Sequence, residues 1–290
     1  MNRRDFFSAS AAVGAASVLG AEPVHGSAPE TPRVAAAFKH SVTRWPFRQF
    51  TVDELARIAR ELKIDSVELL EPAEWPIARR HGLTCAMGYA TVPDPSTRLT
   101  SGFNDTANHA SLVPAYERAI PLAAAAGIPN LICFSGNRNG MSDEQGLANC
   151  ASGLGKLMPA AEKHGVTICM ELLNSKVDHR DYQCDRTPWG VALAKKLDSE
   201  RFKLLYDIYH MQIMEGDVIR TIRDNSKYIG HYHTAGVPGR HEIDATQELQ
   251  YPAIMRAISE TGFSGYVAQE FIPTRDPRTS LAEAIRICSV

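Results

Sequence analysis

Short apolar runs alternate with amphipathic segments along most of this chain. Eight runs are predicted to be strands, at residues 34–42, 66–70, 84–89, 130–135, 166–173, 202–206, 228–233 and 265–271. About eight segments with apolar residues at helical spacing follow them. Strands that are apolar throughout are typical of a parallel sheet covered on both faces. The rhythm across residues 33–290 predicts one α/β domain, a (β/α)8 TIM barrel, for which about 250 residues is typical.

An open doubly wound sheet is the alternative architecture. No G-x-G-x-x-G motif follows the first predicted strand and no P-loop occurs, so nucleotide binding on such a sheet has no support. Local signals place several helix starts. Thr51–Glu54 and Ser142–Gln145 both have the form of a capping box, and the second is predicted to open one helix that continues to about His164. The polar stretch 91–109 is predicted to be a lid or a substrate-facing loop, with disorder as the alternative.

The N-terminus has the order of features found in export signals. Arg3 and Arg4 precede an alanine-rich apolar stretch at 8–19, and small residues follow. We predict a twin-arginine signal and leader over residues 1–28, hence a periplasmic protein exported in the folded state. A frayed, alanine-rich helix is the alternative. The apolar stretch is too short to span a membrane, so no membrane association is expected after export.

Charge and cysteine usage narrow the classes of partner. The formal net charge is -2, from 31 basic and 33 acidic residues, which leaves no basic surplus for a nucleic-acid partner. The six cysteines form no C-x-x-C pair, so buried free thiols are expected rather than a disulfide framework. A homo-oligomer is left open.

Four successive predicted strands end in side chains that can bind a metal. They are Glu171, Asp207, His233 and Glu270. In a barrel the C-terminal ends of the strands converge on one face, so these side chains should meet. Three carboxylates buried together require a cation. Three oxygen ligands and one imidazole favour Mn2+ or Mg2+, with Zn2+ or Co2+ less suited.

Each of these residues also has an ordinary structural explanation. The explanations are a salt bridge of Glu171 with Lys176 or Arg180, a helix cap for Asp207, a core histidine for His233, and a salt bridge of Glu270 with Arg275. The four explanations would have to hold together, and the shared metal site is therefore preferred.

Three further residues are predicted to contact a substrate. His210 follows Asp207 by three residues and should lie just above it. Arg240 lies in a glycine-containing loop after His233, and its guanidinium suits a carboxylate or a phosphate. Trp45, at the end of the first strand, is expected to form an apolar wall over the site.

The chain resembles the hydroxypyruvate isomerase family, within the xylose-isomerase-like barrels. The resemblance is carried by Tyr206–Gly216, Val237–Glu242 and Tyr266–Pro273, and the stretch Glu171–Lys176 is similar to the family's motif on strand five. It is strong from Glu171 to Pro273 and looser before that.

The resemblance implies a (β/α)8 barrel with one divalent metal. It implies that Glu171 and Glu270 are both ligands and the catalytic acid–base pair, and that Asp207 and His233 complete the coordination sphere. It also implies that His210 and Arg240 hold the substrate. Glu242, in the same motif as Arg240, is expected to be a further substrate contact.

The expected function is a metal-dependent isomerase. It would transfer a proton through an enediolate on hydroxypyruvate or a similar small hydroxy-carbonyl compound or sugar. A ketose 3-epimerase is the alternative, because the ketose epimerases carry His at the position of His233 whereas the hydroxypyruvate isomerases carry Gln. Two alternatives from other classes are an endonuclease IV-like metal phosphodiesterase and a non-catalytic sugar-binding barrel.

Overall fold

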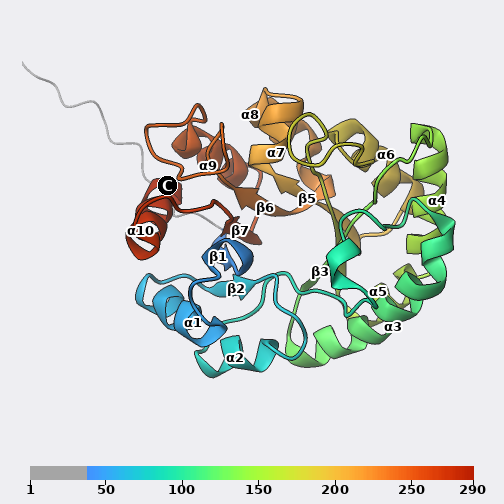
Figure 1. Ribbon diagram of the computed structural model, residues 1–290, viewed down its shortest axis with the longest axis horizontal. Coiled ribbons are helices and arrows are strands. Elements are labelled where there is room, and N and C mark those ends of the chain that lie inside the picture. The colour runs from blue at the N-terminus through green and yellow to red at the C-terminus, as the bar shows by residue number, and fades with distance from the viewer. Residues whose placement is uncertain (1–37) are drawn as a thin grey trace, which may run out of the picture. The chain divides into compact units, whose positions relative to one another are not determined.

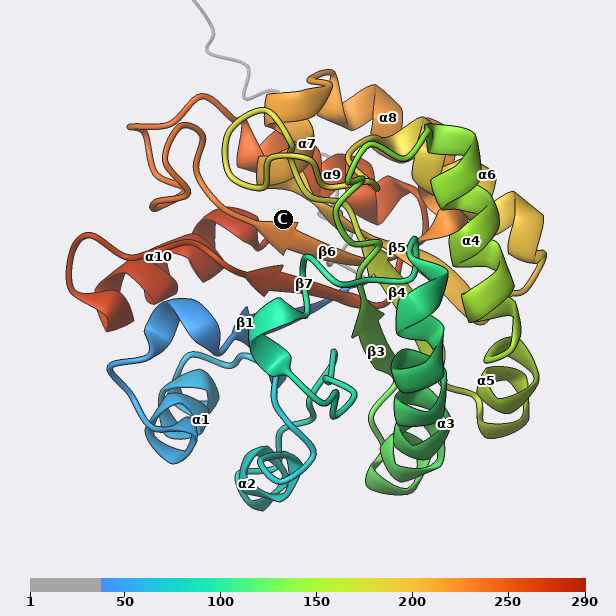
Figure 2. The same ribbon diagram turned by 45° about the vertical axis from the view of Figure 1, so that its right-hand side comes forward.

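The computed structural model describes residues 38–290, and a parallel sheet lies at the centre of this part of the chain (Figure 1). Its seven strands are β1 (Lys39–Thr43), β2 (Ser66–Glu68), β3 (Asn130–Cys133), β4 (Thr167–Glu171), β5 (Phe202–Asp207), β6 (Ile229–Thr234) and β7 (Tyr266–Gln269). They are ordered β2-β1-β7-β6-β5-β4-β3, and β3 to β7 run side by side in Figure 2. The first strand therefore pairs with the last, as in a barrel, and all C-terminal ends face one side.

The third predicted strand, at residues 84–89, is reduced to isolated bridges. Thr84 bridges to Ser66, and Gly88 bridges to both Leu70 and Leu131, so this segment fills the gap between β2 and β3. A Cβ at Gly88 would lie 2.9 Å from the ring of Trp75, so only glycine allows this approach. The predicted barrel is confirmed, with one of its eight strands replaced by single backbone contacts.

Helices lie outside the strands and form a ring around them (Figure 1). They are α1 (Val52–Glu61), α2 (Trp75–Arg80), α3 (His109–Ala126), α4 (Asp143–Gly155), α5 (Met158–His164), α6 (Thr187–Leu197), α7 (Ile208–Met214), α8 (Val218–Asn225), α9 (Tyr251–Glu260) and α10 (Pro277–Cys288). The predicted capping box before α1 is present, since Thr51 and Glu54 exchange both hydrogen bonds. Ser142 likewise accepts a hydrogen bond from the backbone N–H of Gln145 at the start of α4.

The single helix predicted from Ser142 to His164 is wrong, because the structure forms α4 and α5 instead. Pro159 lies in the first turn of α5. In one continuous helix its ring would clash with the carbonyl of Gly155, four residues earlier. The break at Lys156 and Leu157 avoids that clash.

The interior of the described part is apolar, and all six cysteines are buried and free, as expected. Among residues 38–290, no helix combines the length and apolar character that a membrane crossing requires. The predicted export signal, at residues 1–28, lies outside the described residues.

Candidate metal centre and active site

The ends of four neighbouring strands bring four metal-binding side chains together. Glu171 is the last residue of β4 and Asp207 the last of β5; His233 is the penultimate residue of β6, and Glu270 follows β7. All four are buried, and one ligand atom from each lies within 4.8 Å of those of the others. Asp207 and His233 are direct partners in the sheet, which sets them at one height. Three carboxylates and one imidazole at this spacing fit a divalent cation.

The imidazole of His233 connects two of the carboxylates. Its Nδ1 lies 2.8 Å from Oε2 of Glu270 and 3.4 Å from Oε1 of Glu171. The other oxygen of Glu270 accepts a hydrogen bond of 2.6 Å from Nε1 of Trp45. Trp45 was expected to be an apolar wall, but it also holds one of the two predicted catalytic carboxylates through its indole N–H.

The pKa values of these buried carboxylates are shifted in different directions. Burial and the neighbouring charge of Glu270 raise the pKa of Glu171 to about 7. Burial likewise raises the pKa of Asp207 to about 6. For Glu270, the charges of His233 and Arg240 outweigh burial and hold its pKa well below the ordinary value. The protein's own cations therefore offset only part of the carboxylate charge, as expected of a site built around a metal ion.

Arg240 reaches directly into the group of ligands. Its Nη2 donates to Oδ2 of Asp207 at 2.8 Å and also to Oε2 of Glu270. Its backbone is in the left-handed region, with φ of 60°, and its carbonyl accepts a 2.7 Å hydrogen bond from the N–H of Ile272. The loop after β6 is thereby tied to the segment after β7, which aims the guanidinium at the carboxylates.

His210 is buried beside Arg240. Its Nδ1 accepts a 3.2 Å hydrogen bond from the backbone N–H of Asn174, and its Nε2 lies 2.5 Å from Nη1 of Arg240. Burial, together with the charge of Arg240, holds the pKa of His210 well below the ordinary value, so the ring is neutral. A neutral imidazole has one acceptor nitrogen, so the tautomer of His210 decides whether it accepts at Nδ1 from Asn174 or at Nε2 from Arg240.

Asp207 combines two roles that the sequence presented as alternatives. Its Oδ1 accepts hydrogen bonds from the backbone N–H groups of Tyr209 (2.9 Å) and His210 (3.3 Å), which caps α7. Its Oδ2 faces Arg240 and the metal-binding group. The cap therefore orients the carboxylate and sets His210 one helical turn later, above it.

The salt bridges of Glu171 with Lys176 and of Glu270 with Arg275 are not formed among the described residues. Lys176 donates to the carbonyls of Ile213 and Met214 instead of pairing with Glu171. Arg275 pairs with Glu242, Asp244 and Glu283, and not with Glu270.

Glu242 is not brought into the cavity. Its carboxylate accepts hydrogen bonds from the backbone N–H of Thr274 (2.8 Å), the backbone N–H of Arg275 (3.1 Å) and the hydroxyl of Ser280 (2.9 Å). Although burial would raise the pKa of Glu242, these donors outweigh burial and lower it to about 2. The structure thus uses Glu242 to anchor the segment that leads into α10, which differs from the substrate contact expected for it.

A second buried cluster lies behind His233 and was not anticipated. Oε1 of Glu68, at the end of β2, lies 2.8 Å from Nε2 of His233 and 2.9 Å from Nε2 of His231, while Ser41 donates to its Oε2 at 2.6 Å. Burial alone would raise the pKa of Glu68, but the two histidines lower it to about 2. The carboxylate thus holds a proton on Nε2 of His233, so Nδ1, which faces Glu171 and Glu270, is the nitrogen that would bind a metal. One sequence signal could have pointed to this cluster, because Glu68 is an acidic residue in the otherwise mostly apolar second predicted strand.

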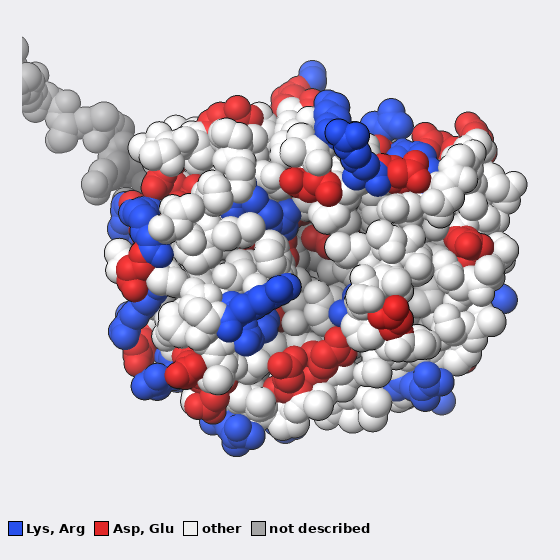
Figure 3. All heavy atoms as spheres, in the orientation of Figure 1, with Lys and Arg blue, Asp and Glu red and all other residues white. Residues whose placement is uncertain are grey.

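A cavity of about 500 Å3 opens above the metal-binding group. Figure 3 shows this face hollowed near its centre, with acidic and basic side chains around the hollow. Its lining includes Glu171, Glu270, His210, Arg240 and Trp45, and also Tyr89, Asp178, His179, Pro95, Ser96, Arg98 and Leu99. Part of the 91–109 stretch thus faces the cavity, which agrees with the prediction of a lid or a substrate-facing loop rather than disorder. Sequence reasoning did not single out Tyr89, Arg98 or His179 as site residues.

The profile of the xylose isomerase-like TIM barrel family matches residues 35–288. The chain belongs to this family.

Two relatives show which enzymes of this family the chain is similar to. It is 37% identical to a 2-oxo-tetronate isomerase of Cupriavidus necator, over 39% of this chain and 43% of that protein, so this match spans less than half of the relative. It is 25% identical to a putative hydroxypyruvate isomerase of Homo sapiens, over 83% of this chain and 82% of that protein. These names support the expectation of an isomerase.

Solved structures share the fold. A protein of Brucella melitensis described as AP endonuclease, family 2, superposes with a TM-score of 0.78 at 23% identity, covering 86% of this chain and 99% of that one. A D-psicose 3-epimerase determined in the presence of D-fructose gives a TM-score of 0.66 at 18% identity, covering 85% and 90%. At these identities the likeness establishes the barrel alone.

Proposed function

We propose that this protein is a divalent-metal-dependent isomerase of a short hydroxy-oxo acid, such as hydroxypyruvate or a 2-oxo-tetronate. The observation that carries the proposal is the meeting of Glu171 and Glu270 with Asp207 and His233 at the floor of one cavity. The relatives' names supply the substrate class. Oxygen-rich ligation favours Mn2+ or Mg2+ as the ion, with Zn2+ or Co2+ as less suited alternatives.

The residues divide the work of the proposed reaction between them. Glu171, Asp207, His233 and Glu270 would hold the ion, which supplies a Lewis acid for the substrate carbonyl and for the charge that develops on it. One of the two glutamates takes the proton from the carbon beside the carbonyl. The other delivers a proton to the neighbouring carbon, and the hydroxyl proton passes to the former carbonyl oxygen, which completes the isomerisation through an enediolate.

His210 and Arg240 are proposed to hold the substrate over the glutamates. Nη1 of Arg240 lies 2.5 Å from Nε2 of His210, and both side chains line the cavity that also contains the two glutamates. A substrate oxygen bound at this pair would replace the contact between Arg240 and His210 and accept hydrogen bonds from the guanidinium. The remaining contact of Arg240 with Asp207 keeps the guanidinium over the floor of the cavity.

The test is solvent deuterium incorporation by the protein supplied with Mn2+. Hydroxypyruvate, 2-oxo-tetronate, short ketoses and hexuloses form the panel, and exchange is expected with the acids. Metal analysis should find one ion per chain. Absence of exchange with every compound, in protein that binds one ion, contradicts the isomerase proposal and leaves a sugar-binding barrel.

A 3-epimerase is the second candidate, and His233 favours it, because the resemblance gives the ketose epimerases His at this position. The two reactions differ in the carbon that receives the proton, so the position of deuterium in the product, read by NMR, separates them. An endonuclease IV-like activity would instead require two or three metal ions per chain and cleavage of abasic DNA.

We also propose that residues 1–28 direct export to the periplasm by the twin-arginine route. The adjacent Arg3 and Arg4, before an apolar stretch and small residues, support this. Export should stop when both arginines are replaced by lysine, as read by N-terminal sequencing and fractionation. An intact Met1 in cytosolic wild-type protein contradicts the proposal.

A further inference from the structure

One wall of the active-site cavity carries an arginine that has unused hydrogen-bond donors. Arg98 lies on the 91–109 stretch, its side chain is only 13% exposed, and its Nη2 donates to Oε1 of Glu71 at 2.6 Å. A guanidinium has five N–H donors. Within residues 38–290 the guanidinium of Arg98 makes no other hydrogen bond. This cation therefore has donors to spare inside a cavity that also contains Glu171 and Glu270.

The ring of Tyr89 fixes the plane of this guanidinium. Cζ of Arg98 lies 3.8 Å from the centroid of the Tyr89 ring, which is a close stacking contact. Stacking on an aromatic face leaves the edge of the guanidinium, where its N–H groups point, open to a planar anion. The hydroxyl of Tyr89 makes no hydrogen bond with the described part of the chain. Burial raises the pKa of this phenol, so the hydroxyl remains a donor at neutral pH.

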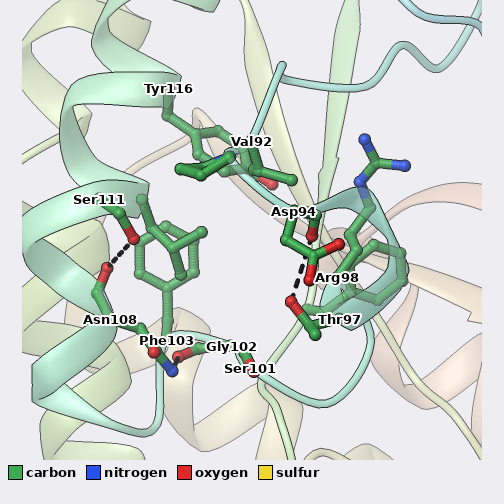
Figure 4. Close-up of a pocket in the computed structure, with 13 residues that line it drawn as sticks. Val92, Asp94, Thr97, Arg98, Ser101, Gly102, Phe103, Asn108, Ser111 and Tyr116 are labelled. Carbon is green, nitrogen blue, oxygen red and sulfur yellow. Dashed lines mark hydrogen bonds between the residues drawn. The ribbon is translucent and has the colours of Figure 1, made fainter.

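Backbone turns at the start of the 91–109 stretch direct Arg98 toward Tyr89. Asp94 accepts hydrogen bonds from the backbone N–H of Ser96 (2.9 Å) at its side chain and from the Thr97 hydroxyl (3.1 Å) at its carbonyl. A smaller cleft of about 200 Å3 lies between this turn and α3. Figure 4 shows Arg98 at the edge of that cleft, with its guanidinium pointing away from Ser111 on α3. Arg98 therefore lines both the smaller cleft and the active-site cavity.

The other arginines of the cavity are less suited to bind a substrate anion. Arg240 is engaged by Asp207 and Glu270. Arg48 is exposed at the cavity and has no ion pair among the described residues, so water and salt compete for its charge. Arg98 is shielded from solvent, held in one plane and bound to a single, partly exposed carboxylate. It can exchange Glu71 for a ligand without uncovering a buried charge.

We propose that Arg98, stacked on Tyr89, binds the carboxylate of the substrate and so selects short hydroxy-oxo acids over neutral sugars. The proposal rests on the proposed function, and it adds the orientation of the substrate in the cavity. The hydroxy-carbonyl end faces Glu171 and Glu270, and the acid end faces the 91–109 wall. A planar carboxylate matches the N–H edge of a stacked guanidinium with two parallel hydrogen bonds.

The test measures binding without turnover, by titration calorimetry on the Mn2+-loaded protein. Glycerate is the carboxylate probe, glycerol 3-phosphate the phosphate probe and glycerol the neutral probe; none of them has a carbonyl to isomerise. Arg98→Met should weaken glycerate binding about 10- to 100-fold, the range of a charge-assisted contact. Arg98→Lys should retain part of it, and glycerol should respond to neither change. The matched control Arg118→Met, an exposed arginine on α3, should stay within about twofold of wild type.

A second variant gives a result that misfolding cannot imitate. Glu71→Gln removes the carboxylate that competes for Arg98, so glycerate should bind more tightly, by about 3- to 10-fold. The same gain should vanish when Arg98→Met is added to Glu71→Gln. Thermal unfolding of each variant reports whether the 91–109 wall still folds.

Four outcomes would overturn the assignment. These are unchanged glycerate binding in Arg98→Met, an equal loss for glycerol, a larger loss in Arg48→Met, and a dependence on Arg98 that is stronger for glycerol 3-phosphate than for glycerate. Failure of the isomerase proposal looks different, because the wild type would then show no deuterium exchange although glycerate binding still depended on Arg98.

Discussion

The two halves of this barrel contribute different chemistry to one site. Strands β4 to β7 end in Glu171, Asp207, His233 and Glu270, which converge directly on the predicted metal position. Strands β1 to β3 and their loops contribute none of these four. They supply groups that act on the four, such as the N–H of Trp45 on Glu270 and the carboxylate of Glu68 on His233. The C-terminal half thus holds the proposed chemistry, and the N-terminal half positions it.

The comparison shows that a strand-end acid has no single meaning in this fold. Glu68 ends β2 as Glu171 ends β4, and both are buried. Glu68 is surrounded by two histidines and a serine, and its pKa falls to about 2. Glu171 has carboxylate neighbours, and its pKa rises to about 7. The neighbours across the barrel, and not the position on the strand, decide whether the acid supports the site or belongs to it.

The largest expected effect lies in the C-terminal half. Glu171→Gln and Glu270→Gln should each lower proton exchange by about 10^3-fold or more, because an amide cannot accept the substrate proton. Deuterium incorporation into the best acid substrate measures the effect, with circular dichroism as the check on folding. Glu117→Gln, at an exposed acid of α3, is the matched control. Persistent exchange in both active-site variants would remove the catalytic role from this half.

The next effect tests whether the N-terminal half positions the metal. Glu68→Gln should weaken Mn2+ binding about 10- to 100-fold. The change removes the charged acceptor that holds the proton on Nε2 of His233 and orients the ring. Ser41→Ala, which removes only the 2.6 Å contact with the far oxygen of Glu68, should have a smaller effect. Calorimetric titration with Mn2+ gives both values. Unchanged metal affinity in Glu68→Gln would reduce this cluster to core packing.

Trp45→Phe should have a smaller effect than the loss of Glu270 itself. It keeps an apolar wall but removes the 2.6 Å hydrogen bond to Oε1 of Glu270, and about a tenfold lower exchange rate is expected. A fall in kcat with little change in KM would mark a positioning role. A change confined to KM would instead support the apolar-wall interpretation drawn from the sequence.

The smallest effect concerns an acid of the C-terminal half that lies outside the site. Glu242→Gln should lower the free energy of unfolding at pH 7 by about 1 kcal/mol, because its charged oxygens accept hydrogen bonds from Thr274, Arg275 and Ser280. Since folding lowers the pKa of Glu242 from 4.5 to about 2, the wild-type advantage is complete above pH 4.5 and is lost toward pH 2. Urea unfolding at several pH values measures it, and an advantage that grows on acidification would contradict the structural role.

The alternation of apolar and amphipathic segments was sufficient to predict the barrel and the convergence of the four strand-end ligands. Apolar periodicity can be read from neighbouring residues in the sequence. The C-terminal ends of parallel strands lie on one face of the barrel irrespective of loop conformation. The same local signals did not reveal the break between α4 and α5, or the reduction of residues 84–89 to bridges. The helix break follows from Pro159, a local signal that the prediction did not use, whereas the bridges depend on the approach of Gly88 to Trp75 in the packed chain.

The sequence by itself determined which residue types stand at the ends of β4 to β7, and hence the candidate metal site. Only the tertiary structure decided that Glu68 reaches His233, that Glu242 turns toward α10, and that Arg98 stacks on Tyr89 beside the active-site cavity. These contacts join residues from different elements, and Glu68 and His233 are 165 positions apart. No local pattern encodes such pairs, because closure of the barrel and the paths of its loops set which side chains meet.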